Sequence, residues 1–297
     1  MRQNLASTIA IWVITLVTAG FSTNSHALIV SIDEFTILRN DALFFTDSFT
    51  DGNPPPSTPT PTFADGTAAS YLIQGTFPSG SEAGGSLQLN TAIGQPSFNA
   101  IGQERLTVGA TAATDRSTNF ALGLKSDDTL SVTGIFSLTT PPGPLFSGYG
   151  LQLQDGPVGG SNHQVLQIFV NFNVATGQPR ISFILQDFDA DSITTLGSAL
   201  LTPPGGANEI LLNISRPDLA NDNFFASFAY VTGGVVGSST QFSLSGLGFQ
   251  GEDFVRARFF ASQDLPLAVP EPGTAWLIGL AGLFMLAGMR RAPISKK

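Results

Sequence analysis

The middle of the chain alternates apolar and polar residues with a period of two, and this pattern constrains the fold more than any other feature. Apolar side chains occupy alternate positions in segments such as 166–172, 181–185 and 210–214. Such alternation predicts half-buried β-strands. Clusters rich in Gly, Pro and Asp separate the segments, and no stretch of 28–269 keeps a 3.6-residue period for ten residues. The sequence therefore predicts an all-β fold with little helix.

The composition excludes several classes of protein. Of the 297 residues, 42% are hydrophobic and 12% are charged, which is too apolar a balance for an intrinsically disordered chain. The formal net charge of −9 argues against nucleic acid as a partner, because a polyanion attracts basic surfaces. The chain has no cysteine, which excludes disulfides, thiolate metal sites, iron–sulfur clusters and a cysteine nucleophile. We therefore expect a folded, acidic protein that binds no nucleic acid.

The N-terminal segment 1–27 has the layout of a signal peptide. Met1 and Arg2 give a positive start, an uncharged apolar stretch follows, and small residues at Ser25 and Ala27 stand three and one positions before a cut after Ala27. We expect removal by signal peptidase and export of the remainder. The alternative is an N-terminal membrane helix that is never cleaved.

The C-terminal segment 266–297 contains a second membrane signal. Residues 274–289 carry no charge and as a helix would span about 24 Å, slightly less than a bilayer core of about 30 Å. Arg290 and Arg291 open a basic stop over 290–297, which favours a cytoplasmic end and an exported body. Pro270 and Pro272 keep the peptide before this helix extended, as a protease requires. We expect a marginal transmembrane helix preceded by a cleavable peptide.

The order of these features resembles the PEP-CTERM sorting signal of Gram-negative bacteria. The motif over 269–274 consists of Val269, Pro270, Glu271, Pro272, Gly273 and Thr274. The resemblance implies recognition by an exosortase, removal of the tail, and transfer from the inner membrane to the cell surface or the exopolysaccharide matrix. It describes transport and leaves the activity of the body open. The alternative is a C-terminal anchor that is never cleaved.

The segment 28–265 is expected to form one β-sandwich ectodomain, because all-β domains of this length are commonly undivided. Segments 45–52, 148–155 and 254–260 resemble the concanavalin A-like lectin/glucanase family. The resemblance implies a two-sheet jelly roll in which the first and last strands pair and the 148–155 strand lies in the middle. Fold alone does not fix function.

Catalytic signatures are absent from the predicted ectodomain. Glycoside hydrolases of the resembled family carry an E-x-D-x-x-E strand, which sets two carboxylates across the scissile bond. None of the glutamates has an acidic partner at that spacing; they are Glu34, Glu82, Glu104, Glu209 and Glu252. His163 is the one histidine, and no G-x-S-x-G segment accompanies it. We expect a non-catalytic protein, with a glycan-active hydrolase of the same fold as the alternative.

Asp187, Asp189 and Asp191 form the best candidate metal site. In an extended segment these three carboxylates would share one face, and Ca²⁺ takes several oxygen ligands. The sequence lacks the Gly and distal Glu of an EF-hand loop. A calcium site and a solvated acidic strand end therefore both stay open.

Two tyrosines are candidate sugar platforms. Sugar-binding modules stack pyranose rings on exposed aromatics, and both tryptophans of this chain lie in the terminal segments, at Trp12 and Trp276. Tyr149 and Tyr230 are therefore the candidates for stacking against a sugar ring. The alternative is that both tyrosines pack in the core. Taken together, these features predict an exported, non-catalytic surface or matrix protein with weak affinity for extracellular polysaccharide.

Overall fold

The computed structural model describes the greater part of the predicted ectodomain. The described residues are 28–52, 63–64, 66, 69–74, 82–90, 101–110, 128–141, 147–154, 164–173, 175–188, 190–218, 223–246 and 255–264. The predicted signal peptide and the sorting tail lie outside them. Strands dominate the described residues and no helix occurs among them, so the predicted all-β fold is confirmed.

One sheet has nine strands, which run antiparallel to their neighbours. Its order is β14-β13-β12-β7-β1-β5-β4; β15 also pairs with β13, and β2 with β1. The strands are β1 (Ile29–Arg39), β2 (Ala42–Asp47), β4 (Glu82–Ala83), β5 (Ser86–Asn90), β7 (Leu130–Ser137), β12 (Glu209–Asp218), β13 (Asn223–Thr232), β14 (Val235–Val236) and β15 (Thr240–Leu244).

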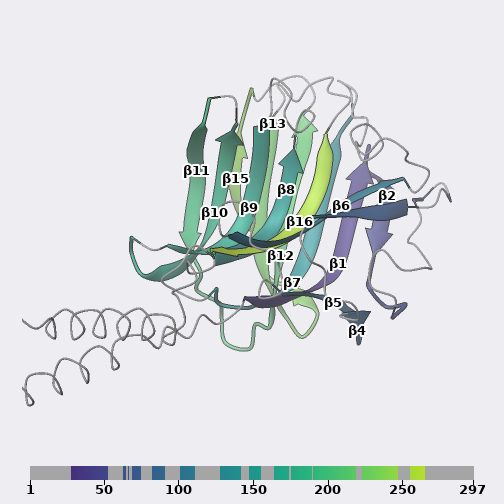
Figure 1. The fold of residues 1–297 in the computed structure, drawn as a ribbon, viewed down its shortest axis with the longest axis horizontal. Helices are drawn as coiled ribbons and strands as arrows, with labels where there is room; N and C mark the ends of the chain where they lie inside the picture. Colours follow the sequence, from purple (N-terminus) through teal and green to yellow (C-terminus); the bar gives the residue numbers. More distant parts are fainter. Residues whose placement is uncertain are drawn as a thin grey trace, which may run out of the picture.

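The other sheet has seven antiparallel strands in the order β11-β10-β9-β8-β16-β6-β3. The two sheets lie face to face (Figure 1). The strands of this sheet are β3 (Ala69–Gln74), β6 (Ile101–Ala110), β8 (Ser147–Gln154), β9 (Gln164–Asn173), β10 (Gln178–Asp187), β11 (Ser192–Leu200) and β16 (Arg256–Asp264).

The alternating segments of the sequence become the central strands of both sheets. The segments 166–172, 181–185 and 210–214 lie in β9, β10 and β12, and β8 is the middle strand of its sheet, as the resemblance implies. The implied pairing of the first and last strands is wrong. The segment 45–52 begins in β2, which pairs with β1 in the nine-stranded sheet, whereas 254–260 lies largely in β16, which pairs with β6 and β8 in the other sheet.

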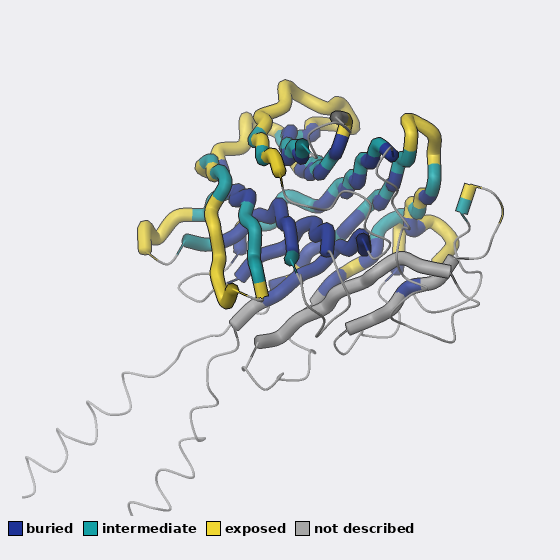
Figure 2. Tube along the Cα trace, turned by 90° about the horizontal axis from the view of Figure 1, so that it is seen from above, coloured by how far each residue is buried: buried dark blue, intermediate teal, exposed yellow. Residues whose placement is uncertain are grey.

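The core fills the space between the sheets, and Figure 2 shows its buried stretches in dark blue. An aromatic cluster joins the sheets near one end. The rings of Phe35 on β1 and Phe259 on β16 have centroids 5.0 Å apart, and Phe45, Phe49 and Tyr71 pack around them. Such aromatic pairs add specific edge-to-face contacts to burial. These phenylalanines therefore fill the core between the two sheets.

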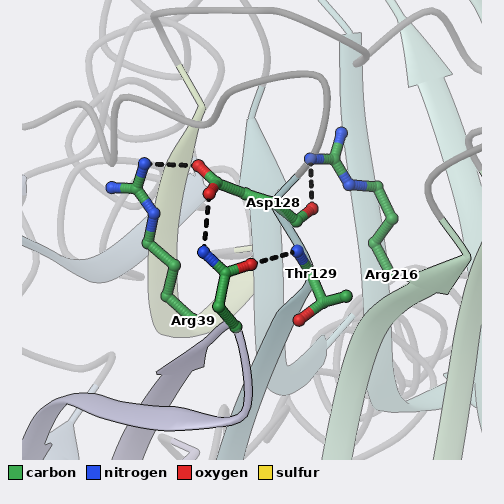
Figure 3. Close-up of polar contacts among 5 residues, drawn as sticks. Arg39, Asp128, Thr129 and Arg216 are labelled. Carbon is green, nitrogen blue, oxygen red and sulfur yellow. Dashed lines mark hydrogen bonds and ion pairs between the residues drawn. The ribbon is translucent and has the colours of Figure 1, made fainter.

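A polar network fixes the turn between β1 and β2 (Figure 3). Arg39 forms an ion pair with Asp128, and Asn40 donates from Nδ2 to Oδ1 of the same carboxylate over 2.7 Å. The amide of Thr129 donates to Oδ1 of Asn40 over 2.9 Å, and Arg216 donates to the carbonyl oxygen of Asp128 over 2.7 Å. The network ties together β1, the segment before β7, and β12.

Candidate functional site

The seven-stranded sheet has a polar face that points away from the other sheet and is nevertheless buried. Strand register places alternate residues on this face in rows; one row consists of Ile184, Gln167, Gln152 and Arg258. Its buried polar side chains are Gln152, Gln154, Gln167, Asn171, Ser182, Arg256, Arg258 and Ser262. Burial of so many polar groups is unfavourable unless they form hydrogen bonds. We call this surface the outer polar face and treat it as the candidate site.

A ladder of glutamine amides crosses three strands of the outer polar face. Gln152 on β8 donates from Nε2 to Oε1 of Gln167 on β9 over 3.0 Å, and Gln167 donates from Nε2 to Oε1 of Gln186 on β10 over 3.3 Å. Gln152 is 2% exposed, Gln167 is 7% exposed and Gln186 is half-buried. Oε1 of Gln152 is buried and accepts no hydrogen bond from the described residues. The ladder thus begins at the buried Oε1 of Gln152 and ends at the half-buried Gln186.

Two glycines of β8 allow an aromatic pair to form beside this ladder. A Cβ at Gly150 would lie 2.2 Å from the carbonyl oxygen of Ile168 and 2.6 Å from Cα of Phe169, and one at Gly148 would be crowded as well. The rings of Phe169 and Phe260 pack with centroids 6.2 Å apart. The glycines of the 148–155 segment are therefore needed for the close approach of β9 to β8.

The outer polar face opens toward solvent at β10 and β11. Ile193 is 66% exposed and Leu200 is 56% exposed. The open part of the face, which we call the open quarter, consists of Arg180, Ile184, Gln186, Ile193, Thr195, Ser198 and Leu200. It mixes amide and hydroxyl groups with apolar side chains and contains one charged group. It offers hydrogen-bonding groups and apolar contact side by side, although none of these seven residues is aromatic.

The structure separates the two candidate tyrosines from this surface. Tyr149 is fully buried against Phe136, and its hydroxyl donates to the carbonyl oxygen of Thr139 over 3.0 Å. Burial raises the pKa of Tyr149 above its ordinary value. The expected platform at Tyr149 is therefore wrong. Tyr230 is half-buried and its hydroxyl accepts from the amide of Thr202 over 2.9 Å, so its role as a platform stays a prediction.

Two of the three aspartates proposed for calcium, Asp187 and Asp191, lie at the turn between β10 and β11. Asp187 ends β10; its Oδ1 accepts from the amide of Ala190 over 2.9 Å, and its Oδ2 accepts from Nε2 of Gln164 over 3.1 Å. Asp191 is exposed with φ of 46°, and Asp189 lies outside the described residues. Among the residues that the structure describes, no three His, Cys, Asp or Glu side chains form a metal-binding group. The calcium site stays a prediction.

A carboxylate cluster that the sequence did not reveal lies where β2 ends. Oδ2 of Asp47 accepts from the hydroxyl of Tyr71 over 2.8 Å, and its Oδ1 accepts from the amide of Phe49 over 2.9 Å. Oε1 of Glu82 on β4 accepts from the amide of Gly52 over 3.0 Å. The cluster joins segments that are distant in sequence, so no local spacing could have predicted it.

The environment of this cluster favours the protonated form of its carboxyl groups. Burial and a hydrogen bond with Asp51 raise the pKa of Glu82 to about 7. Burial also raises the pKa of Asp47. On β1, burial and the charge of Glu209 raise the pKa of Asp33 to about 6. The pKa of each of these three carboxyl groups is thus raised above its ordinary value.

The comparisons with known proteins concern the C-terminal tail. A family model described as the PEP-CTERM protein-sorting motif matches residues 268–291. This match includes the motif over 269–274 and also Arg290 and Arg291, and it confirms the predicted sorting signal. No curated protein matches the chain. Within the described part of the chain, no helix is long and apolar enough to cross a membrane, and the expected helix over 274–289 lies outside that part.

The match has one direct consequence for the biology of the chain. A PEP-CTERM signal supports export of the protein and sorting to the cell surface by an exosortase. The match covers the tail alone and carries no statement about the ectodomain, so the chemistry of the body must be argued from the outer polar face and the carboxylate cluster.

Proposed function

We propose that the chain is an exported, non-catalytic protein of the cell surface or exopolysaccharide matrix, whose ectodomain binds extracellular polysaccharide. In this proposal signal peptidase removes 1–27, the helix over 274–289 holds the protein transiently in the inner membrane, and an exosortase acts at the motif over 269–274. The match to the sorting motif over 268–291 supports this route.

The glutamine ladder is the observation that carries the binding proposal. Each amide of the ladder is oriented by its neighbour, so Gln186 at the solvent-facing end is held by Gln167 over 3.3 Å. Such pre-oriented amides bind a hydroxyl without a further loss of side-chain entropy. Exposed Ile193 pairs with Gln186 at this end, and exposed Leu200 pairs with Arg180 at the other end of the open quarter. Each can cover C–H groups of a sugar ring by apolar contact. The open quarter therefore fits a neutral, hydroxyl-rich ligand.

The charge of the protein limits the class of polysaccharide. The chain carries 22 acidic and 13 basic side chains, which disfavours strongly anionic glycans at most surfaces. Within the open quarter the one charged group is Arg180, which is half-buried. We therefore propose a neutral polysaccharide, or one with few acidic groups, as the ligand.

The carboxylate cluster supports a non-catalytic role over the hydrolase alternative. Retaining and inverting glycosidases hold their two carboxyl groups about 5 Å or about 6.5–9.5 Å apart. In this cluster a hydrogen bond with Asp51 contributes to the raised pKa of Glu82. The other oxygen atoms of the cluster accept hydrogen bonds from Gly52, Phe49 and Tyr71. The cluster therefore holds residues 47–52 against β3 and β4.

A binding and turnover assay tests the proposal. Protein recovered from the surface of an exosortase-containing host is titrated with the host's own polysaccharide, and reducing ends are measured in the same samples. Gln186→Ala should weaken binding about fivefold or more, in line with loss of one oriented hydrogen bond. Gln241→Ala, on an exposed position of β15, is the matched control.

Three results would decide against the proposal. Equal affinity of the wild type and Gln186→Ala would remove the open quarter as the binding surface. Release of new reducing ends would support the hydrolase alternative. Absence of binding to any polysaccharide of the producing cell would remove the ligand class.

A further inference from the structure

β11 is an unprotected edge strand. It ends the seven-stranded sheet, with β10 on one side only. Its nine residues, Ser192–Leu200, include neither a charged residue nor a proline, although lysine and proline are the usual protection of edge strands. β11 stands at the margin of the fold in Figure 1 and is exposed along most of its length (Figure 2). An edge strand presents outward-pointing N–H and C=O groups to any strand that can pair with it.

The neighbouring edge of the other sheet is also uncharged. The segment 223–246, which contains β13, β14 and β15, has no charged residue. The ring of Phe242 on β15 lies against Gly197 of β11, where an added Cβ would approach it to 2.4 Å. Val235 is 70% exposed and Val236 is 49% exposed on β14. One side of an acidic protein is therefore neutral and carries exposed apolar side chains.

We propose that β11 pairs antiparallel with β11 of a second copy of this chain, with Ile193 opposite Leu200 of the second copy. In a two-fold arrangement this register also sets Thr195 opposite Ser198 and Thr194 opposite Ala199. The two sheets would then form one continuous sheet across the pair.

The pattern of β11 supports this register. Pairing with β10 places Ile193, Thr195, Ser198 and Leu200 on the outer face, and Thr194 and Ala199 on the core side. The register shifts by one residue between Thr195 and Gly197. Because of this extra residue, odd-numbered positions before the shift and even-numbered positions after it lie on the same outer face. Every proposed pair therefore joins residues of the same face. Apolar residues meet apolar residues and hydroxyls meet hydroxyls on the outer face, as favoured cross-strand pairs require.

Charge and symmetry favour a second copy as the occupant. A chain of net charge −9 repels itself at most surfaces, and β11 is a segment where two copies meet without opposing charges. A two-fold contact is closed, so pairing of β11 stops at two copies. The pair would present two open quarters on one side of the continuous sheet. This inference does not depend on polysaccharide binding, since assembly is measured without ligand.

Paired cysteines test the register directly, because the chain has no cysteine of its own. In the variant Thr195→Cys/Ser198→Cys, each new thiol lies opposite the other position of the second copy. Within one chain the two positions are about 10 Å apart along the strand, which is too far for a disulfide. Mild oxidation should therefore give a covalent dimer on a non-reducing gel. The control variant Ile193→Cys/Ser198→Cys has the same number of thiols out of register and should stay monomeric.

Solution mass provides a second, independent measurement. Surface-recovered protein at about 50 μM should have the mass of two chains by light scattering, and Ile193→Lys/Ser198→Lys should have the mass of one. Leu43→Lys, at an apolar residue of β2 that is 48% exposed, is the control and should remain a dimer. A monomeric wild type would overturn the proposal. A cysteine control that links as readily as the test pair, or an open series of larger species, would overturn it too.

Discussion

Arg39 on β1 and Asp128, which is 89 residues later in the chain, form an ion pair. Asp128 is 4% exposed, and its carboxylate also accepts from Asn40. The backbone carbonyl of Asp128 accepts from Arg216, which is 1% exposed. A pair of aspartates at 127 and 128 reads in the sequence as a surface turn, yet Asp128 holds together three parts of the nine-stranded sheet.

Removing the charge of Asp128 should destabilise the fold. Asp128→Asn keeps the shape of the side chain but leaves Arg39 without its ionic partner. We expect a loss of about 1–3 kcal/mol in the free energy of unfolding, because a buried hydrogen bond to a charged group is lost. Urea unfolding followed by circular dichroism measures it. Asp41→Asn, on the exposed β1–β2 turn, is the control, and equal midpoints for both variants would show that the network contributes nothing.

The close approach of β8 and β9 predicts an intolerant glycine. Gly150→Ala would place a Cβ 2.2 Å from the carbonyl oxygen of Ile168, so the backbone must shift. We expect a loss of about 1–3 kcal/mol or more, the range of overpacked sites. Gly205→Ala is the matched control, because nothing lies within 4 Å of its added Cβ. Thermal unfolding measures both variants. Equal melting temperatures for Gly150→Ala and Gly205→Ala would show that β9 does not pack tightly against Gly150.

The carboxylate cluster predicts a pH dependence of stability. The pKa of Glu82 rises from its ordinary 4.5 to about 7 on folding, so between these values the folded state retains a proton that the unfolded state has lost. Stability therefore decreases as pH rises through this window and is lowest above pH 7. The raised pKa of Asp33, about 6, acts in the same direction.

Glu82→Gln isolates this contribution. The wild type should unfold at a higher urea concentration at pH 5 than at pH 8, and Glu82→Gln should show a smaller difference, because a neutral amide replaces the titrating group. Asp41→Asn should retain the wild-type difference. If the stability of Glu82→Gln depended on pH as strongly as that of the wild type, groups other than Glu82 would cause the pH dependence of stability.

The hairpin at 187–192 predicts a calcium effect if the aspartates bind the ion. A ligand that binds only the folded state raises the melting temperature by mass action. Saturating Ca²⁺ should then raise the melting temperature of the wild type and leave that of Asp189→Ala unchanged. Identical melting curves with Ca²⁺ and with a chelator would show that Asp187 and Asp191 only order the turn.

Local periodicity predicted the strands well. The alternation in 166–172 and 181–185 marks the side chains that face the core, and the structure places those segments in β9 and β10. β9 is nevertheless buried on both faces, not half-buried as the alternation predicts. In β8 the same logic failed at Tyr149, because every residue of that strand is buried and polarity no longer separates core from surface. The sequence also did not predict which strands pair with β1. β2, β5 and β7 pair with it, and such pairing depends on the whole sheet and not on the local sequence of β1.

The candidate site was only partly predictable. Single glutamines at 152, 167 and 186 are ordinary polar strand residues in the sequence, and only the register across β8, β9 and β10 aligns them into a ladder. The cluster of Asp47, Glu82 and Tyr71 likewise depends on long-range packing. The sorting motif over 269–274 was predictable because a peptide signal is local and needs no fold.

The central claim is that the tail is a sorting signal, which we propose is removed at the inner membrane before the body reaches the cell surface. Replacing Pro270, Glu271 and Pro272 by alanines would let the helix extend upstream and would remove the extended peptide that an exosortase requires. This variant should remain membrane-bound at full length. Pro293→Ala, beyond the helix, is the matched control and should be processed like the wild type.

The most direct measurement is the intact mass of the surface-exposed protein from a host that carries its own exosortase. We predict that the mature wild-type protein has lost the tail, and that the triple alanine variant retains it. A wild-type protein that still ends at Lys297, as in the variant, would contradict the sorting account and identify the tail as a simple anchor.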